Sequence, residues 1–223
     1  MAERVDQLIP YGYAETAIST FHAFGDRVLR EAAVEAGLDP QFRVLSQPEE
    51  IIFLREHLFA LPLRRFRPLG DPTRHLSALT TLVSRAKDED VSPAQYRAWT
   101  ETRLAVARSE AERDEAEGQR ELAEFYEAHQ RLLAEAGLVD FGDQIHRTLG
   151  LLRERPAVLA RLRARYRFVL VDEFQDTNHA QLEMLKLLAG ETANLTVVGD
   201  DDQAIYRWRG AAAANLLAFR RLY

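Results

Sequence analysis

The stretch Phe168-Val-Leu-Val-Asp-Glu-Phe-Gln-Asp-Thr-Asn178 sets the architecture predicted for this chain. A short run of β-branched and aromatic residues ends in two adjacent carboxylates, and a helix start follows at once. A second apolar run, Leu195-Thr-Val-Val-Gly-Asp-Asp-Asp-Gln203, repeats the pattern. Helical spacing over residues 179–189 separates the two, which predicts a strand–helix–strand unit with parallel pairing. Acids at the carboxyl ends of parallel strands face the edge where α/β proteins bind ligands.

The composition indicates a globular protein of the cytoplasm. The 223 residues are 47% hydrophobic and 29% charged, which excludes a disordered chain. The chain has no cysteine, so disulfides and thiolate metal sites are excluded. It shows neither a secretory signal pattern nor an apolar run long enough for a membrane span, so we expect no membrane contact.

The charge balance leaves nucleic-acid binding open. A net charge of −6 does not favour it, but a local basic path is sufficient for binding. Lys87 and Lys186 are the only lysines, and the other basic residues are arginines. Arginine suits phosphate contacts and base stacking, although a GC-rich genome produces the same bias.

The spacing of apolar residues predicts a helix-dominated α/β chain with a divided α/β layer. Residues 1–30 and 138–223 are predicted to form that layer, and residues 31–137 an inserted all-α subdomain. The predicted elements are a strand at 14–20, helices at 21–36 and 73–87, helices beginning at Ser46 and Ser92, a long charged helix over 101–121, an irregular connector at 61–72, and two helices within 141–165.

Asp172 and Glu173 are the first candidate catalytic residues. They follow an apolar run, so their side chains are expected on opposite sides of the strand end. In phosphoryl-transfer sites one such acid holds Mg²⁺ and a second orients the attacking water. Exposed acids beside a helix N-cap explain the pair equally well, and the two residues alone leave both interpretations open.

The segment from Gly199 to Gly210 carries the second group of candidates. Gly199 permits a close turn after the strand, and the amide of Gln203 can donate to a phosphate oxygen. Tyr206 and Trp208, with Arg207 and Arg209 beside them, suit base stacking and phosphate contact. Alternatively, Trp208 anchors a core and the arginines are solvated.

Together these two segments resemble motifs II and III of the UvrD/Rep/PcrA group of superfamily 1 DNA helicases. Ser19-Thr-Phe-His-Ala-Phe24 is similar to the family segment that contacts single-stranded DNA. Leu138-Val-Asp-Phe-Gly-Asp-Gln-Ile145 is similar to Leu-Asp-Phe-Asp-Asp-Leu-Leu, with Gly142 where an aspartate is usual. Residues 1–5 would be the end of the helix that carries motif Ia. The matches follow the family order along nearly the whole chain.

The resemblance implies part of a RecA-like P-loop NTPase sheet that uses ATP and Mg²⁺. Residues 1–30 and 138–223 would be motor domain 1A, and residues 31–137 subdomain 1B. Asp172 would bind Mg²⁺, Glu173 would activate the hydrolytic water, and Gln203 would sense the γ-phosphate. Six positions would complete the DNA and nucleotide contacts, with Tyr206 and Trp208 stacking on bases: Thr20, His22, Gln203, Tyr206, Trp208 and Arg209. For His22 an N-cap or core hydrogen bond is the alternative.

The resemblance also implies that the nucleotide site is incomplete. The family's phosphate-binding loop needs a lysine after glycines, whereas Lys87 follows Ala86 and Lys186 follows Leu185. That loop would lie upstream of Met1, and the second motor domain downstream of Tyr223. We therefore expect a fragment, natural or laboratory-made, of a 3′–5′ DNA helicase that is inactive as an ATPase on its own.

Three other functions are alternatives to a helicase motor. A degenerate relative would bind DNA or a partner without hydrolysis, and a recombination helicase–nuclease subunit shares the same motifs. A metal nuclease using Asp172, Glu173 and the acids at 200–202 is disfavoured, because no lysine lies near the acids in sequence. The expected partners are single-stranded and duplex DNA, with repair or recombination proteins.

Overall fold

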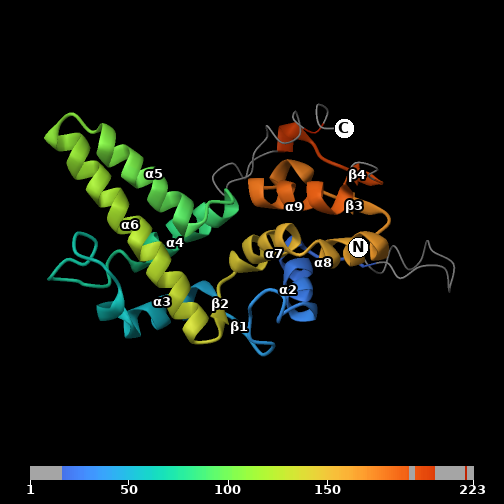
Figure 1. Cartoon of the computed structure of the whole chain (residues 1–223), viewed down its shortest axis with the longest axis horizontal. Helices are drawn as coiled ribbons and strands as arrows, with labels where there is room; N and C mark the ends of the chain where they lie inside the picture. Colours follow the sequence, from blue (N-terminus) through green and yellow to red (C-terminus); the bar gives the residue numbers. More distant parts are fainter. Residues whose placement is uncertain (1–16, 191–193, 204–218, 220–223) are drawn as a thin grey trace.

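The computed structural model describes residues 17–190, 194–203 and 219. Figure 1 shows a helix-dominated chain in which the strands β3 and β4 lie at one end and a pair of long helices projects at the other. The elements are α2 (Phe21–Glu31), β1 (Arg43–Val44), α3 (Gln47–Glu56), η1 (Leu58–Ala60), α4 (Leu76–Asp88), α5 (Pro93–Val106), α6 (Glu110–Glu135), β2 (Leu138–Val139), α7 (Asp143–Glu154), α8 (Pro156–Arg165), β3 (Val169–Val171), η2 (Phe174–Asp176), α9 (His179–Ala189), β4 (Leu195–Val197) and η3 (Asp201–Gln203).

The predicted strand–helix–strand unit is confirmed. β3 and β4 pair in parallel, with Val169 opposite Leu195 and Val171 opposite Val197, and α9 forms the connection. Asn178 caps α9, because its side chain accepts a hydrogen bond from the backbone of Gln181. The unit therefore directs the segments after β3 and β4 to the same edge of the sheet.

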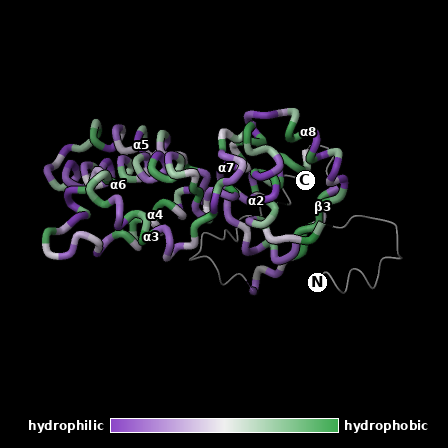
Figure 2. The backbone as a smooth tube through the Cα atoms, turned by 90° about the horizontal axis from the view of Figure 1, so that it is seen from below, coloured by the Kyte–Doolittle hydropathy of each residue, from purple (hydrophilic) through white to green (hydrophobic). Residues whose placement is uncertain are grey.

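Hydrophobic clusters divide the described helices into two lobes, which lie side by side in Figure 2. The α/β lobe consists of α2, α7, α8 and α9 with β3 and β4, and residues such as Leu29, Leu149 and Met184 fill its core. The helical lobe consists of α3 to α6, and Leu54, Phe125 and Tyr126 are among its buried residues. Phe42 packs into the α/β core although it precedes the helical lobe by only a few residues.

β1 and β2 form a small parallel ladder at the base of the helical lobe, which the apolar spacing did not predict. Arg43 lies opposite Leu138 and Val44 opposite Val139. The chain passes through β1 just before α3 and through β2 just after α6. The two crossings between the lobes are therefore hydrogen-bonded neighbours.

The prediction of one long charged helix over 101–121 was wrong. α5 ends at Val106 and α6 begins at Glu110, so the segment folds back into a helical hairpin. Ser109 begins α6 with a capping box, in which its hydroxyl accepts from the backbone of Glu112 and the Glu112 carboxylate accepts from the Ser109 backbone. Gly118 lies inside α6, where it is buried.

The strand expected at 14–20 and the connector expected at 61–72 have different outcomes in the structure. No strand is assigned to residues 17–20, the described part of the strand expected at 14–20, and residues 14–16 lie outside the described chain. Thr20 instead caps α2 by accepting from the backbone of Ala23. The irregular connector at 61–72 is confirmed, and the carboxylate of Glu121 anchors it by accepting from the backbones of Arg64, Arg65 and Phe66.

Within the described ranges, no helix combines the length and the apolar character that crossing a membrane requires.

Candidate nucleotide and nucleic-acid site

Asp172 and Glu173 lie where the chain leaves β3. The strand ends at Val171, so strand alternation does not place these two side chains, and both residues are exposed. Glu173 has φ 53° and ψ 42°, the left-handed conformation that non-glycine residues seldom adopt. Such strain is characteristic of functional turns, where surrounding contacts hold an unfavourable backbone in place.

A continuous chain of hydrogen bonds links Glu173 to Gln203. The amide of Gln175 donates to Glu173 Oε2 over 2.6 Å, and its carbonyl oxygen accepts from the Asp200 backbone over 3.0 Å. The Asp200 side chain then accepts from Gln203 Nε2 over 2.7 Å. The acids after β3 and the glutamine after β4 therefore belong to one connected network.

Gln175 is the member of this network that the sequence did not single out. It is buried, and it bridges the segments that follow the two strands. Gly199 makes this approach possible, because a Cβ at that position would lie 2.7 Å from Gln175 Oε1. A glycine is needed here for close contact, as predicted for the turn, and the neighbour is the side chain that holds Glu173.

The donor set at the end of β3 suits a hard divalent cation. Asp172 presents an exposed carboxylate, and its Oδ1 accepts a 3.1 Å hydrogen bond from the Glu173 backbone. Carboxylate oxygens with room for water are what Mg²⁺ requires. Asp172 would hold the ion, which would supply charge neutralisation for phosphate oxygens.

The lysines of the chain are committed elsewhere. Lys186 pairs with Glu183 over 2.6 Å, three residues away on α9. Lys87 is buried and binds the carboxylates of Asp140 and Asp143. Neither ammonium group is therefore free to hold the phosphates of a nucleotide at the end of β3.

Of the residues expected to contact DNA, Thr20 and His22 lie at the start of α2. Thr20 is exposed at the start of this helix and lines a small hollow of about 180 Å³ against β3. His22 faces a different hollow, an interlobe cleft of about 680 Å³ that also contacts α4 and the β2–α7 turn. Burial lowers the pKa of His22, which favours the neutral imidazole. Tyr206, Trp208 and Arg209 lie outside the described residues.

His22 is not the N-cap of α2, and among the described residues no hydrogen bond to its imidazole is found. Thr20 is the N-cap of α2, and the imidazole of His22 stacks on the ring of Phe141 with centroids 4.0 Å apart and planes 22° apart. The two family-like segments at 19–24 and 138–145 thus meet through this ring pair.

A buried ion cluster lies beneath the β2–α7 turn, and the sequence did not reveal it. We use this name for Lys87, Asp140, Asp143, His129 and Glu50. Lys87 Nζ lies 2.9 Å from Asp143 Oδ1 and also bonds to Asp140, while His129 Nε2 lies 2.7 Å from Glu50 Oε1. Lys87, His129 and Glu50 come from the helical lobe, whereas the two aspartates begin the return to the α/β lobe.

The charges in this cluster stabilise one another. Burial opposes the charged form of Lys87, but the two carboxylates outweigh burial and raise the lysine pKa. Burial likewise disfavours the ionised form of Asp143, yet Lys87 and Arg147 hold the pKa of Asp143 well below its usual range. Both groups are therefore ionised inside the protein, and each depends on the other.

Three members of the cluster resemble a metal site in their composition. Ligand atoms of Glu50, His129 and Asp140 lie within 4.8 Å of one another. However, the Lys87 ammonium already occupies Asp140, and the Glu50 carboxylate is bonded to His129. A metal ion would have to displace a fixed cation, so the geometry favours an ionic contact between the lobes.

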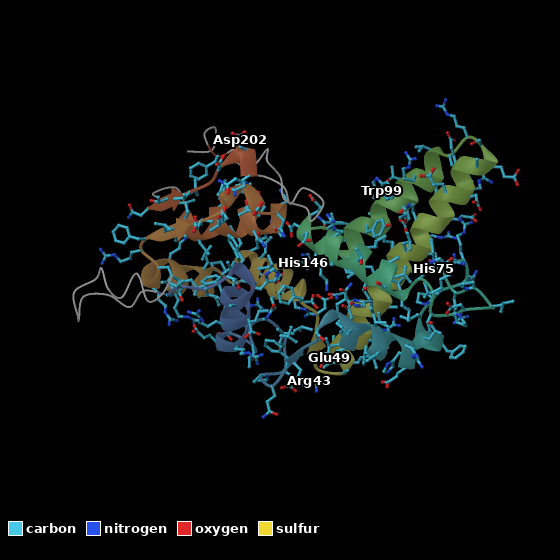
Figure 3. The ribbon with its side chains drawn as sticks, turned by 180° about the vertical axis from the view of Figure 1, so that it is seen from behind. Arg43, Glu49, His75, Trp99, His146 and Asp202 are labelled. Carbon is cyan, nitrogen blue, oxygen red and sulfur yellow. The ribbon has the colours of Figure 1, made fainter. Side chains whose placement is uncertain are left out.

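His146 marks the junction of the lobes in Figure 3, and Asp202 lies at the upper edge of the α/β lobe. His146 Nδ1 is 3.6 Å from Asp90 Oδ1, and the Arg153 guanidinium binds the other Asp90 oxygen over 2.7 Å. Burial and the nearby Lys87 lower the pKa of His146. The polar contacts at the junction thus continue beyond the buried ion cluster.

Asp88 connects α4 directly to the segment that follows Glu173. Its Oδ1 accepts a 2.7 Å hydrogen bond from the side-chain amide of Asn178, the cap of α9. Burial raises the pKa of Asp88 to about 6, and Arg85 opposes that shift. At neutral pH the ionised Asp88 carboxylate at the junction of the lobes therefore lowers the free energy of unfolding.

We expect Asp88→Asn to stabilise the protein at neutral and alkaline pH. Asparagine keeps an acceptor for Asn178 and removes the buried charge, so the free energy of unfolding should rise by on the order of 1 kcal/mol at about pH 8. The folded carboxyl, with a pKa of about 6 against a reference of 3.8, binds more protons than the unfolded one between these values. Stability of the unsubstituted chain therefore falls as pH rises through that range, and the advantage of asparagine shrinks as pH is lowered.

Urea unfolding at several pH values measures this effect. Glu56→Gln changes an exposed acid on α3 and serves as the control, with little expected change at any pH. An Asp88→Asn advantage that is absent or independent of pH would contradict the assignment.

The chain was compared with known proteins. A family model described as the UvrD/REP helicase N-terminal domain matches residues 1–223. DNA helicase II of Haemophilus influenzae is 32% identical over 202 residues, which are 91% of this chain and 25% of that protein. The ATP-dependent DNA helicase PcrA of Leuconostoc citreum is 35% identical, over 100% of this chain and 27% of that protein. The ATP-dependent DNA helicase Rep of Salmonella typhimurium is 34% identical, over 97% of this chain and 29% of that protein. The chain thus spans less than a third of the length of these relatives, and it belongs to the UvrD/REP helicase N-terminal domain family.

Proposed function

We propose that this chain is the first motor region of an ATP-dependent DNA helicase that translocates 3′–5′ on single strands. The observation that carries the proposal is the hydrogen-bond network from Glu173 through Gln175 and Asp200 to Gln203. In such a network a change in phosphate contact at Gln203 alters the restraint on Glu173. A motor needs this link between nucleotide state and the water-activating acid.

Each candidate residue has a role in this proposal. Asp172 holds Mg²⁺, Glu173 orients and deprotonates the attacking water, and Gln203 contacts the γ-phosphate. Gln175 positions Glu173, since it donates to that carboxylate from a buried site. Thr20 and His22 contact the DNA strand together with Tyr206, Trp208 and Arg209.

The architecture we propose is part of a RecA-like sheet with an inserted subdomain. Residues 1–30 and 138–223 belong to motor domain 1A, and residues 31–137 to subdomain 1B. The separate cores of the α/β and helical lobes support two folding units. Single-stranded and duplex DNA are the proposed partners, repair or recombination proteins would act with it, and a cytoplasmic location accords with the absence of cysteine.

ATP hydrolysis tests this function. In a longer protein that carries this chain with a phosphate-binding loop and a second motor domain, Glu173→Gln should lower DNA-stimulated turnover at least about 100-fold, because a general base is lost. DNA binding should remain, since the substitution keeps the shape of the side chain.

The chain of residues 1–223 by itself supplies the control. It should hydrolyse ATP no faster than its own Glu173→Gln variant, because neither lysine is placed to hold phosphates. Turnover of the isolated chain above that variant, or full turnover of the longer Glu173→Gln protein, would contradict the proposal.

A further inference from the structure

We propose that Asp88, on the helical lobe, is a positioning residue for Glu173: its hydrogen bond to Asn178 anchors the turn between β3 and α9, which begins with Glu173. The inference rests on the proposed function, because it takes Glu173 as the acid that activates water. It adds to the hydrolytic site a residue of the helical lobe, whereas Asp172, Glu173 and Gln203 all follow strands of the α/β lobe.

The turn from Glu173 to Asn178 is one hydrogen-bonded unit. The backbone of Asp176 donates to the Glu173 carbonyl oxygen over 2.9 Å. Thr177 donates twice to the Phe174 carbonyl oxygen, over 3.2 Å from its backbone and over 2.7 Å from its hydroxyl. Phe174 and Thr177 are also buried, so packing holds the same turn. A displacement at Asn178 is therefore transmitted to Glu173 rather than absorbed by a loose loop.

Asn178 is bonded to both lobes. Its Oδ1 accepts from the Gln181 backbone over 2.9 Å and so caps α9, while its Nδ2 donates to Asp88 Oδ1 over 2.7 Å. Burial raises the pKa of Asp88 to about 6, so the carboxylate is largely ionised at neutral pH. A hydrogen bond to an ionised acceptor is stronger than one between neutral groups. The start of α9 is thus fixed to α4 by a charge-assisted bond.

The end of α4 that carries Asp88 is itself held against the α/β lobe. Lys87, the preceding residue, binds the two carboxylates of the β2–α7 turn. Asp90, two residues further on, pairs with Arg153 of α7 over 2.7 Å. Asp88 lies between these ion pairs, so its carboxylate is already in place for Asn178 and loses little freedom in making the bond.

The turn between β3 and α9 faces two sites at once. Asp88, Asp176 and Asn178 line the interlobe cleft, whereas Glu173 begins the hydrogen-bond network that reaches Gln203. The left-handed backbone of Glu173 depends on surrounding contacts to hold it. A ligand in the cleft that shifts α4 would therefore move Asn178 and, through the turn, the acid that activates water.

The test measures ATP turnover by the longer protein that carries a phosphate-binding loop and a second motor domain. The assay uses saturating oligothymidylate at about pH 8, where carboxylates are ionised. Asp88→Leu removes the acceptor, and Asn178→Asp keeps the cap of α9 but sets two carboxylates against each other. Each should lower kcat about 10-fold with little change in the KM for ATP, because the acid and not the nucleotide is displaced. The two variants change the charge of the cleft in opposite directions, so a purely electrostatic effect would not lower kcat in both.

Rescue separates positioning from a general loss of structure. Asp88→Asn keeps an acceptor for Asn178 and should retain kcat. Combined with Asn178→Asp, it restores a donor and an acceptor in the reverse direction and should recover most of the lost turnover. Asp90→Asn is the matched control: it removes a charge from the same segment and loses the pair with Arg153, and asparagine tolerates the left-handed backbone at this position. It should leave kcat unchanged.

The outcomes distinguish this inference from the proposed function. Unchanged kcat in Asp88→Leu and Asn178→Asp, beside a Glu173→Gln protein that has lost turnover, overturns this inference alone. A loss in Asn178→Asp that Asp88→Asn does not rescue overturns it too, as does an equal loss in Asp90→Asn. Full turnover of the Glu173→Gln protein overturns the proposed function, and this inference with it.

Discussion

Replacing Lys87 by methionine should lower the free energy of unfolding by about 3–5 kcal/mol, the usual cost of removing one partner from a buried ion pair. Methionine fills a similar volume, so the main loss is the positive charge. Asp140 and Asp143 would then remain buried at the β2–α7 turn without their cation. Urea unfolding followed by circular dichroism measures the difference.

The other lysine provides the matched control. Lys186 pairs with Glu183 at a partly exposed site within one helix, so Lys186→Met should cost less than about 1 kcal/mol. Adding Asp143→Asn to Lys87→Met should recover part of the loss, because one uncompensated carboxylate disappears. Equal stabilities of the two methionine variants would show that the buried charges are not coupled as the geometry indicates.

Gly25→Ala should destabilise the chain by about 1–3 kcal/mol or more, although alanine normally favours a helix over glycine. Gly25 lies inside α2 where this helix crosses α7, and its added Cβ would be 2.2 Å from the backbone oxygen of Gln144. A backbone atom cannot rotate away, so the two helices must separate. Thr148 Oγ1, which donates to the Gly25 oxygen over 3.2 Å, would lose that bond.

Gly150→Ala is the control for this prediction. It lies on α7, the partner helix of the crossing, and nothing is within 4 Å of its added Cβ. Alanine there should therefore stabilise the protein by about 0.5–1 kcal/mol through helix propensity alone. Thermal unfolding of the two variants should move in opposite directions, and a Gly25→Ala chain as stable as Gly150→Ala would show that the helices can part at no cost.

The elements that depend on neighbouring residues could be predicted from the sequence. The apolar runs at 168–171 and 195–198 become β3 and β4, and the capping pattern after Ser46 begins α3. The acids and Gln203 follow those strands, so their common edge was predictable. The reversal between α5 and α6 was missed because charges of alternating sign continue across it. The capping box of Ser109 and Glu112 was the local evidence for it.

The contacts between distant segments could not be predicted in this way. Lys87 and Asp140 are 53 residues apart, and Glu50 and His129 are 79 apart. Each is a charged or polar residue whose type alone predicts exposure. Glu50 and His129 are buried where α3 packs on α6 within the helical lobe, and Lys87 and Asp140 where the two lobes meet; no periodicity in the chain records either contact. The pairing of His22 with Phe141 was hidden for the same reason.

The ladder between β1 and β2 makes the helical lobe an insertion whose two ends are adjacent. Because Val44 and Val139 are adjacent across a strand pair, the chain leaves the α/β lobe and returns to it within about one strand spacing, roughly 5 Å. The ladder fixes these two ends beside each other, while Lys87 and Asp88 of α4 hold the β2–α7 turn and the start of α9. A change in the chain between the two ends that keeps α4 in place should therefore leave the strand ends that carry Asp172 and Gln203 where they are.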